Sequence, residues 1–248
     1  MKREEKNRRN LPQQQRLLTE NMKLADLLES DYRLLSIVSR LDIPFGFGES
    51  TVGEMCRRHG LSVELFLLIC RIYSSDGRSV PTADHLTVDD LRDIMSYLHR
   101  SHLYYSETVI PRLSSRIGDM TERCDAIQRK ILKTFYSDYC SEVANHFDYE
   151  EQTVFPYVEA LLEGRAPSQH GYSIEKFEAN HSDIDAKLSD LKSIIIKYLP
   201  DSCPAEVRYE VLMDIFRFEE DLSRHTEIEN SVLIPLVEKL ENSQQMPR

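Results

Sequence analysis

The chain has 248 residues, of which 41% are hydrophobic, and a formal net charge of −11 at pH 7. This length accommodates one medium domain and a smaller one, and the apolar share is enough to bury a core. The acidic balance disfavours a general nucleic-acid binder, because phosphate contacts need a basic surface. With only eight glycines and no tryptophan, the composition indicates an all-α protein.

The N-terminal part begins with a polar leader at residues 1–18, whose basic cluster we interpret as a solvated tail rather than a nucleic-acid arm. Apolar residues at helical spacing follow it. They predict helices at 19–41, 51–59 and 62–73. The second of these begins with a possible capping box, and a glycine ends it.

The stretch 74–89 contains Gly77, Pro81 and many small polar residues. Such a composition is typical of a linker. We therefore place a small helical domain at residues 19–80 and a second domain at residues 81–248.

No stretch approaches the ~18–20 consecutive apolar residues of a membrane helix, and the N-terminus lacks the apolar core of a signal peptide. We therefore expect a cytoplasmic protein with no membrane partner. The five cysteines are scattered and form no Cys-x-x-Cys pair. Free buried thiols are favoured over a disulfide framework or a thiolate zinc site.

The second domain contains four long amphipathic segments, separated at Gly118, at residues 164–171 and at residues 200–204. Four such segments with short connections predict an antiparallel up-down four-helix bundle. The predicted segments are 88–118, 120–163, 173–199 and 204–241.

One phrase recurs in this domain: a histidine, then an aliphatic pair and a proline about ten residues later. It runs from His146 to Pro156, from His225 to Pro235 and, more loosely, from His102 to Pro111. In the first two copies a glutamate, Glu150 or Glu229, stands four residues after the histidine. This spacing puts both side chains on one face of a helix, so that they can reach one metal ion.

Each of the four segments carries a histidine near its middle, and mid-helix positions of a bundle converge at one level of its core. Four histidines and two glutamates would give six nitrogen and oxygen ligands. Such a set suits a pair of first-row transition metals better than a closed zinc site. The predicted metal ligands are His102, His146, Glu150, His181, His225 and Glu229.

Two alternatives bear on this ligand set. Ferritin-like carboxylate bundles need a Glu-x-x-His motif on two helices, whereas this chain has one, from Glu178 to His181. On the first segment His99 competes with His102, and the distance to the following proline favours His102.

These phrases resemble the haemerythrin-like HHE cation-binding domain. More narrowly, they resemble the di-iron proteins that repair iron centres, which act on iron–sulfur clusters damaged by oxidative or nitrosative stress. The family's four histidines and two glutamates fall on the six residues above. Asp185, where classical haemerythrins have a further histidine, favours the repair branch. The resemblance implies two carboxylate-bridged non-haem iron ions, dioxygen or nitric oxide as small ligand, and damaged iron–sulfur proteins as partners.

The resemblance extends to the N-terminal domain with one departure. Repair proteins carry an Asp followed by a Cys-Cys-Gly-Gly turn and a later cysteine. Here Asp42 and Cys56 match, but the cysteine pair is absent. The repair function implied by the resemblance therefore rests on the bundle.

Two other functions remain open. The bundle could sense oxygen or nitric oxide and act through a partner or DNA, since residues 50–62 resemble the first half of a helix-turn-helix. The next helix, with the apolar run 65–70, favours a packing role instead. A zinc-loaded or metal-free structural bundle is the third possibility.

Overall fold

The structure is a computed structural model that describes residues 18–75, 85–122, 124–165, 172–180, 184–200 and 204–245. The predicted leader, except Leu18, and the predicted boundary near residue 80 lie outside the described residues. The chain divides into two compact units, residues 1–94 and 95–248. The described residues are helical, with one isolated bridge between Lys23 and Thr51 and no strand. The all-α prediction is therefore confirmed.

Residues 18–75 of the first unit form five short helical elements. The predicted helix over 19–41 is interrupted at Asp31, whose extended backbone stops one helix and whose carboxylate accepts the backbone N–H of Arg33 at 3.1 Å. An aspartate that caps a new turn in this way favours a break over a continuous helix. The elements are α2 (Leu24–Ser30), the 3₁₀ turn η2 (Tyr32–Leu34), α3 (Leu35–Arg40), α4 (Val52–His59) and α5 (Val63–Ser74).

Helix α4 has the predicted capping box. The backbone N–H of Glu54 donates to Thr51 Oγ1 at 3.2 Å, and the N–H of Thr51 donates to Glu54 Oε2 at 2.9 Å. Gly60 ends the helix with a φ of 66°, which glycine adopts without strain. In α5, eight of twelve side chains are buried, so this helix has the character of a packing helix rather than of an exposed recognition helix.

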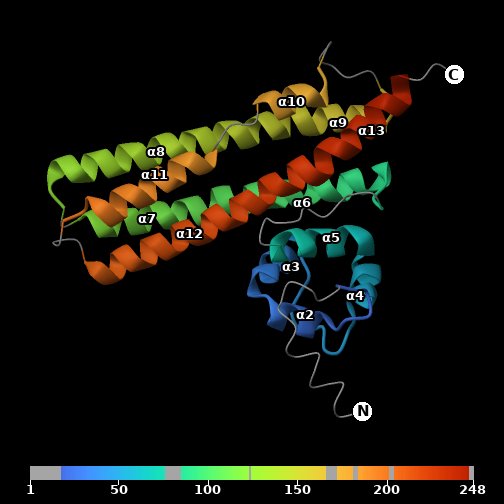
Figure 1. The fold of residues 1–248 in the computed structure, drawn as a ribbon, viewed down its shortest axis with the longest axis horizontal. Coiled ribbons are helices and arrows are strands. Elements are labelled where there is room, and N and C mark those ends of the chain that lie inside the picture. The colour runs from blue at the N-terminus through green and yellow to red at the C-terminus, as the bar shows by residue number, and fades with distance from the viewer. Residues whose placement is uncertain are drawn as a thin grey trace. The chain divides into compact units, whose positions relative to one another are not determined.

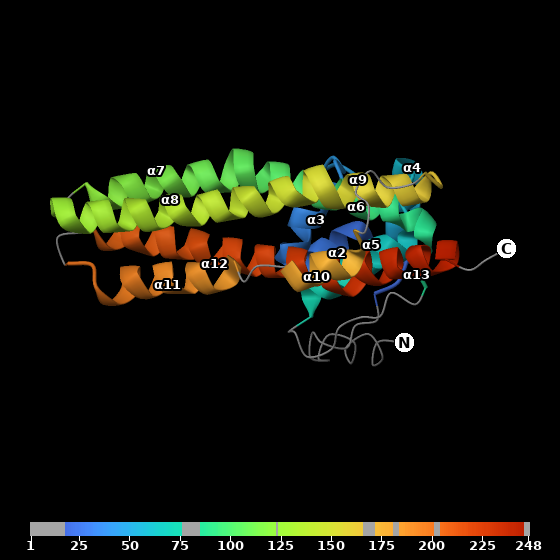
Figure 2. The same cartoon turned by 90° about the horizontal axis from the view of Figure 1, so that it is seen from above.

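The second unit is built on four bundle helices, the first of which begins at Leu91, just before residue 95. Figures 1 and 2 show them as long, nearly parallel elements. Helix α7 packs against α8 and α12, and α11 packs against the same two helices, which closes a ring of four. The four-helix bundle is therefore confirmed. In chain order, the bundle helices are α6 (Leu91–Tyr104), η4 (Tyr105–Val109) and α7 (Ile110–Thr121); α8 (Ala126–Tyr149), η5 (Glu150–Val154) and α9 (Phe155–Leu162); α10 (Ile174–Asn180) and α11 (Ile184–Lys197); and α12 (Ala205–Ile228), η6 (Glu229–Leu233) and α13 (Ile234–Gln245). A 3₁₀ turn, η3 (Val88–Asp90), precedes the first.

The predicted break at Gly118 is wrong, because α7 continues through this residue to Thr121. One glycine in a helix costs only about 1 kcal/mol relative to alanine, which packing can offset. The stronger signal is Asp125, whose carboxylate accepts the N–H groups of Ile127 and Gln128 and starts α8.

An apolar core fills the bundle between α7, α8, α11 and α12, and includes the aromatic side chains of Tyr105, Tyr136, Tyr139, Phe147 and Phe218. No helix of the described residues is long and apolar enough to cross a membrane.

The cysteines differ in one respect from the expectation of free thiols. Cys56 and Cys70 are free and buried, as expected, and burial raises the pKa of Cys56 to about 11. Cys124 is bonded in a disulfide, which the scattered cysteine pattern did not predict.

Candidate metal centre

The repeated proline marks a π-helical turn in three of the four bundle helices. Each turn, η4, η5 or η6, ends two residues before a proline. Proline lacks an N–H, and its ring clashes with the carbonyl four residues earlier in a regular α-helix. The wider π turn avoids this conflict, and such turns are frequent at functional sites. In each, the residue before proline donates its N–H to the carbonyl five residues earlier: Ile110 to Tyr105, Phe155 to Glu150 and Ile234 to Glu229.

Glu150 and Glu229 are the first residues of the turns η5 and η6. Each lies one helical turn after a histidine. The Nε2 atom of His146 is 2.8 Å from Glu150 Oε1, and the Nε2 atom of His225 is 2.9 Å from Glu229 Oε1. The four-residue spacing thus places imidazole and carboxylate on one face, as the sequence predicted.

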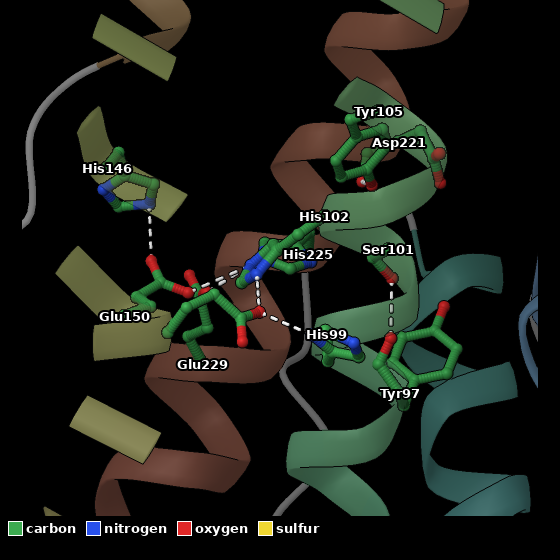
Figure 3. Close-up of polar contacts among 11 residues, drawn as sticks. Tyr97, His99, Ser101, His102, Tyr105, His146, Glu150, Asp221, His225 and Glu229 are labelled. Carbon is green, nitrogen blue, oxygen red and sulfur yellow. Dashed lines mark hydrogen bonds and ion pairs between the residues drawn. The ribbon is translucent and has the colours of Figure 1, made fainter. Parts of the chain in front are cut away.

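His102, Glu150, His225 and Glu229 converge from three bundle helices, with ligand atoms that all lie within 4.8 Å of one another. All four are buried, the most exposed being His102 at 4%. The Nε2 atom of His102 lies 3.1 Å from Glu150 Oε2 and 3.1 Å from the Nε2 atom of His225. Figure 3 shows these side chains pointing toward one another.

His146 lies at the edge of this group. Its nitrogen approaches Oε1 of Glu150, whereas His102 approaches Oε2 of the same carboxylate. Glu150 therefore lies between two imidazoles, with one oxygen toward each (Figure 3). His181, the remaining predicted ligand, lies outside the described residues.

His99 does not enter the cluster. Its side chain is 49% exposed, and its Nδ1 atom lies 2.9 Å from Oε1 of Glu151. The Nδ1 atom of His102 lies 2.7 Å from the same oxygen. Of the two competing histidines, His102 is the one whose second nitrogen faces Glu150 and His225.

Carboxylates determine the electrostatics around His102. Burial lowers the pKa of this imidazole, but contacts with Glu150 and Glu151 outweigh that effect and raise the pKa to about 9. Burial raises the pKa of Glu151, and hydrogen bonds from His102 and His99 reverse this and lower the pKa. The acids on two sides of His102 thus favour its protonated form.

The cluster fits a metal ion. Both carboxylate oxygens of Glu150 are buried with no hydrogen-bond partner among the described residues, although imidazole nitrogens lie 2.8 and 3.1 Å away. These nitrogens approach without the alignment of an N–H···O bond, and a buried polar atom without such a bond costs about 1–3 kcal/mol. Nitrogen and oxygen atoms that converge in this way, without a thiolate, match the preferences of first-row transition metals.

Aromatic rings surround the imidazoles. The ring of His102 stacks on Phe147, with centroids 4.3 Å apart, and lies parallel to Phe155 at 5.8 Å. The ring of Tyr105 meets His225 edge-on at 5.7 Å. These contacts limit rotation of the two histidines and give the cluster apolar walls on the sides that the aromatic rings cover.

Sequence reasoning missed one residue of this site, Glu151, and left Tyr105 open between a hydrogen-bond donor near the ligands and ordinary packing. Glu151 follows Glu150 directly, and from its position in the sequence it would be taken for a solvent-exposed acid. Tyr105 stands six residues before its proline, as Glu150 and Glu229 do before theirs. It is fully buried, and its hydroxyl donates to the backbone oxygen of Asp221 at 3.3 Å. Counting back from each proline would have identified it.

Comparison with known families agrees with this geometry. The family model for the Hemerythrin HHE cation binding domain matches residues 91–237, more than half of the chain. No curated protein and no solved structure matches the chain significantly. The matched range includes every residue of the cluster described above. The chain therefore belongs to the haemerythrin HHE cation-binding family.

Proposed function

We propose that this protein is a non-haem di-iron protein that acts in the repair of iron–sulfur clusters or in the response to oxidative or nitrosative stress. The observation that carries the proposal is the position of Glu150 between His146 and His102, with one oxygen toward each. A carboxylate placed in this way suits a bridge between two cations, as in two-metal sites.

The residues divide into two groups around this bridge. His102 and His225, whose Nε2 atoms are 3.1 Å apart, would hold one ion. His146 would hold the other, together with the sequence-predicted His181. Glu150 and Glu229, both fully buried, supply the negative charge that balances the cations. When bound, an iron pair supplies redox chemistry and a position for dioxygen or nitric oxide.

The surroundings favour binding of small neutral molecules. Phe147 and Phe155 lie along the His102 ring, and Tyr105 meets His225 edge-on. Apolar walls limit access of water and of charged solutes. Dioxygen and nitric oxide are therefore the ligands that we propose.

The proposal of repair rests on the resemblance of the histidine and glutamate phrases to the repair proteins, and damaged iron–sulfur proteins would be the partners. Sensing of oxygen or nitric oxide is the second candidate. The absence of the cysteine pair after Asp42 favours it, because a signalling unit needs no such thiols. Location in the cytoplasm stays a prediction.

The first test is metal content and visible absorption of protein purified without oxygen, with dioxygen and nitric oxide added to separate samples. We expect two iron ions per chain and a spectrum that changes with either gas. Protein that holds no iron, or one zinc ion and no response, would contradict the di-iron assignment.

A second assay separates repair from sensing. A dehydratase whose [4Fe–4S] cluster has been damaged by nitric oxide is incubated with the iron-loaded protein. Recovery of dehydratase activity above that given by free ferrous iron supports repair. Recovery equal to that with free iron favours the sensor.

A further inference from the structure

Glu151 binds two histidines through a single oxygen. Its Oε1 atom accepts from Nδ1 of His102 at 2.7 Å and from Nδ1 of His99 at 2.9 Å. The two histidines are three residues apart on α6, which places them on one face of the helix. Glu151 itself belongs to η5, so the contact joins the first and second bundle helices beside the cluster.

The contact determines which nitrogen of His102 is left for a metal. An ionised carboxylate only accepts hydrogen bonds, so Nδ1 of His102 carries the hydrogen. The bond made by one ring nitrogen fixes the role of the other. The Nε2 atom is then the one that faces Glu150 and His225.

The other histidine of the cluster has no comparable support. The Nδ1 atom of His225 is buried and makes no hydrogen bond with any residue that the structure describes. Asn230, which follows Glu229 as Glu151 follows Glu150, is exposed. Of these two histidines, His102 is therefore the one that an adjacent acid supports among the described residues.

His99 contacts Glu151 from the solvent side. Its side chain is half exposed, that of Glu151 is 30% exposed and that of His102 is 4% exposed. Exposure thus increases from the metal centre to the surface along three hydrogen-bonded residues. With a histidine on each side of its oxygen, Glu151 has little freedom to turn away from His102.

We propose that Glu151 is a positioning residue for His102, that His99 holds it in place, and that this pair sets the affinity of the site for metal. The inference rests on the proposed function, since it assumes that the cluster binds a metal ion. Outer carboxylates that orient ligating histidines commonly change metal affinity by 10–100-fold.

The test is an oxygen-free titration of the full-length protein with ferrous iron, repeated with cobalt(II) for its visible spectrum. Glu151→Ala should weaken binding by about 10–100-fold, with two ions still bound at saturation and an altered cobalt spectrum. Glu151→Gln, whose amide oxygen still accepts one hydrogen bond, should recover part of the loss. His99→Ala should cause a smaller loss.

Asp148→Ala is the matched control, because Asp148 is an exposed acid three residues earlier on the same bundle helix. Glu151→Leu keeps the volume of the side chain and replaces the alanine variant if that variant does not fold. The proposal would be overturned if Glu151→Ala, or Glu151→Leu in its place, showed the same metal affinity and cobalt spectrum as Asp148→Ala. Failure of the unaltered protein to bind either metal would instead contradict the proposed function.

Discussion

Glu150 and Glu229 are both fully buried and, with Glu151, surround the imidazole of His102. Three carboxyl groups lie beside this imidazole, and a bound cation would offset the repulsion between them. Burial of charge that is not fully paired destabilises a fold. Affinity for metal and stability of the metal-free protein are therefore opposed at this site.

Glu229→Gln tests this opposition. The amide keeps the shape of the side chain and removes its charge, so we expect stoichiometric iron binding to be lost. The unfolding midpoint of the metal-free protein should rise by roughly 2–4 °C, which corresponds to about 1 kcal/mol at this chain length. Metal analysis and thermal unfolding followed by circular dichroism measure the two effects. Iron retained at two ions per chain, or a lowered midpoint, would contradict the expectation.

His146→Ala tests the division of ligands around Glu150. His146 contacts Oε1, whereas His102 contacts Oε2, so loss of His146 should remove one ion and leave the other. We expect the iron content to fall from two ions per chain to one. Substitution of the half-exposed His99, which hydrogen-bonds to the outer Glu151, should leave two ions at saturating iron. Two ions in the His146 variant would contradict the division.

The sequence predicted the clustered residues because spacing alone decides which side chains share a helix face. His102 could be preferred to His99 because its distance to Pro111 matches the other copies within one residue. Glu151 could not be identified, because its role depends on a neighbour 49 residues away. Periodicity within one helix carries no information about such contacts.

At the scale of elements, the π turns set the orientation of the helices that come after them. Each turn holds one residue more than an α-helix would, and one residue corresponds to about 100° of rotation. Helix α9 buries Phe155, Tyr157 and Val158 after the turn η5. Its packing therefore depends on the extra residue.

Deletion of Gln152, an exposed residue of η5, tests this dependence. The turn would become α-helical, and the buried face of α9 would rotate away from its neighbours. We expect the unfolding midpoint of the metal-free protein to fall by at least 5 °C, roughly 2 kcal/mol. Gln152→Ala keeps the number of residues and should leave the midpoint within about 1 °C. Equal midpoints for the two variants would show that packing does not require the π turn.

The sequence predicted the helices but not these turns. A proline inside a helical pattern indicates a kink, since proline removes one backbone hydrogen bond. A π turn differs from a simple kink here in one respect: each of the three prolines lies two residues after the end of its turn. The prediction at Gly118 failed for a related reason, because a residue that weakens a helix need not end it.

At the scale of the molecule, every residue of the cluster belongs to the second compact unit. We expect a fragment of residues 85–248, which starts before η3 and α6, to bind as many iron ions as the full chain. Metal analysis of both proteins measures this. Iron lost from a fragment with unchanged helix content would mean that the first unit contributes to metal binding.

Fold class and the histidine–glutamate cluster were predictable because they depend on patterns within single helices. What the protein does with a bound metal was not, because repair and sensing differ in partners rather than in ligands. Two features bear most on the choice between repair and sensing. They are the absence of a cysteine pair after Asp42 and the burial of helix α5. Both belong to the first unit.

The three π turns have one further consequence for how this protein can change over evolutionary time. In the described residues they stand at the level of the histidine–glutamate cluster, in three of the bundle helices. An added residue there shifts the angular phase of every later side chain without moving the earlier ones. We therefore expect substitutions in the helices after the turns to leave the spacing of the clustered histidines and glutamates unchanged.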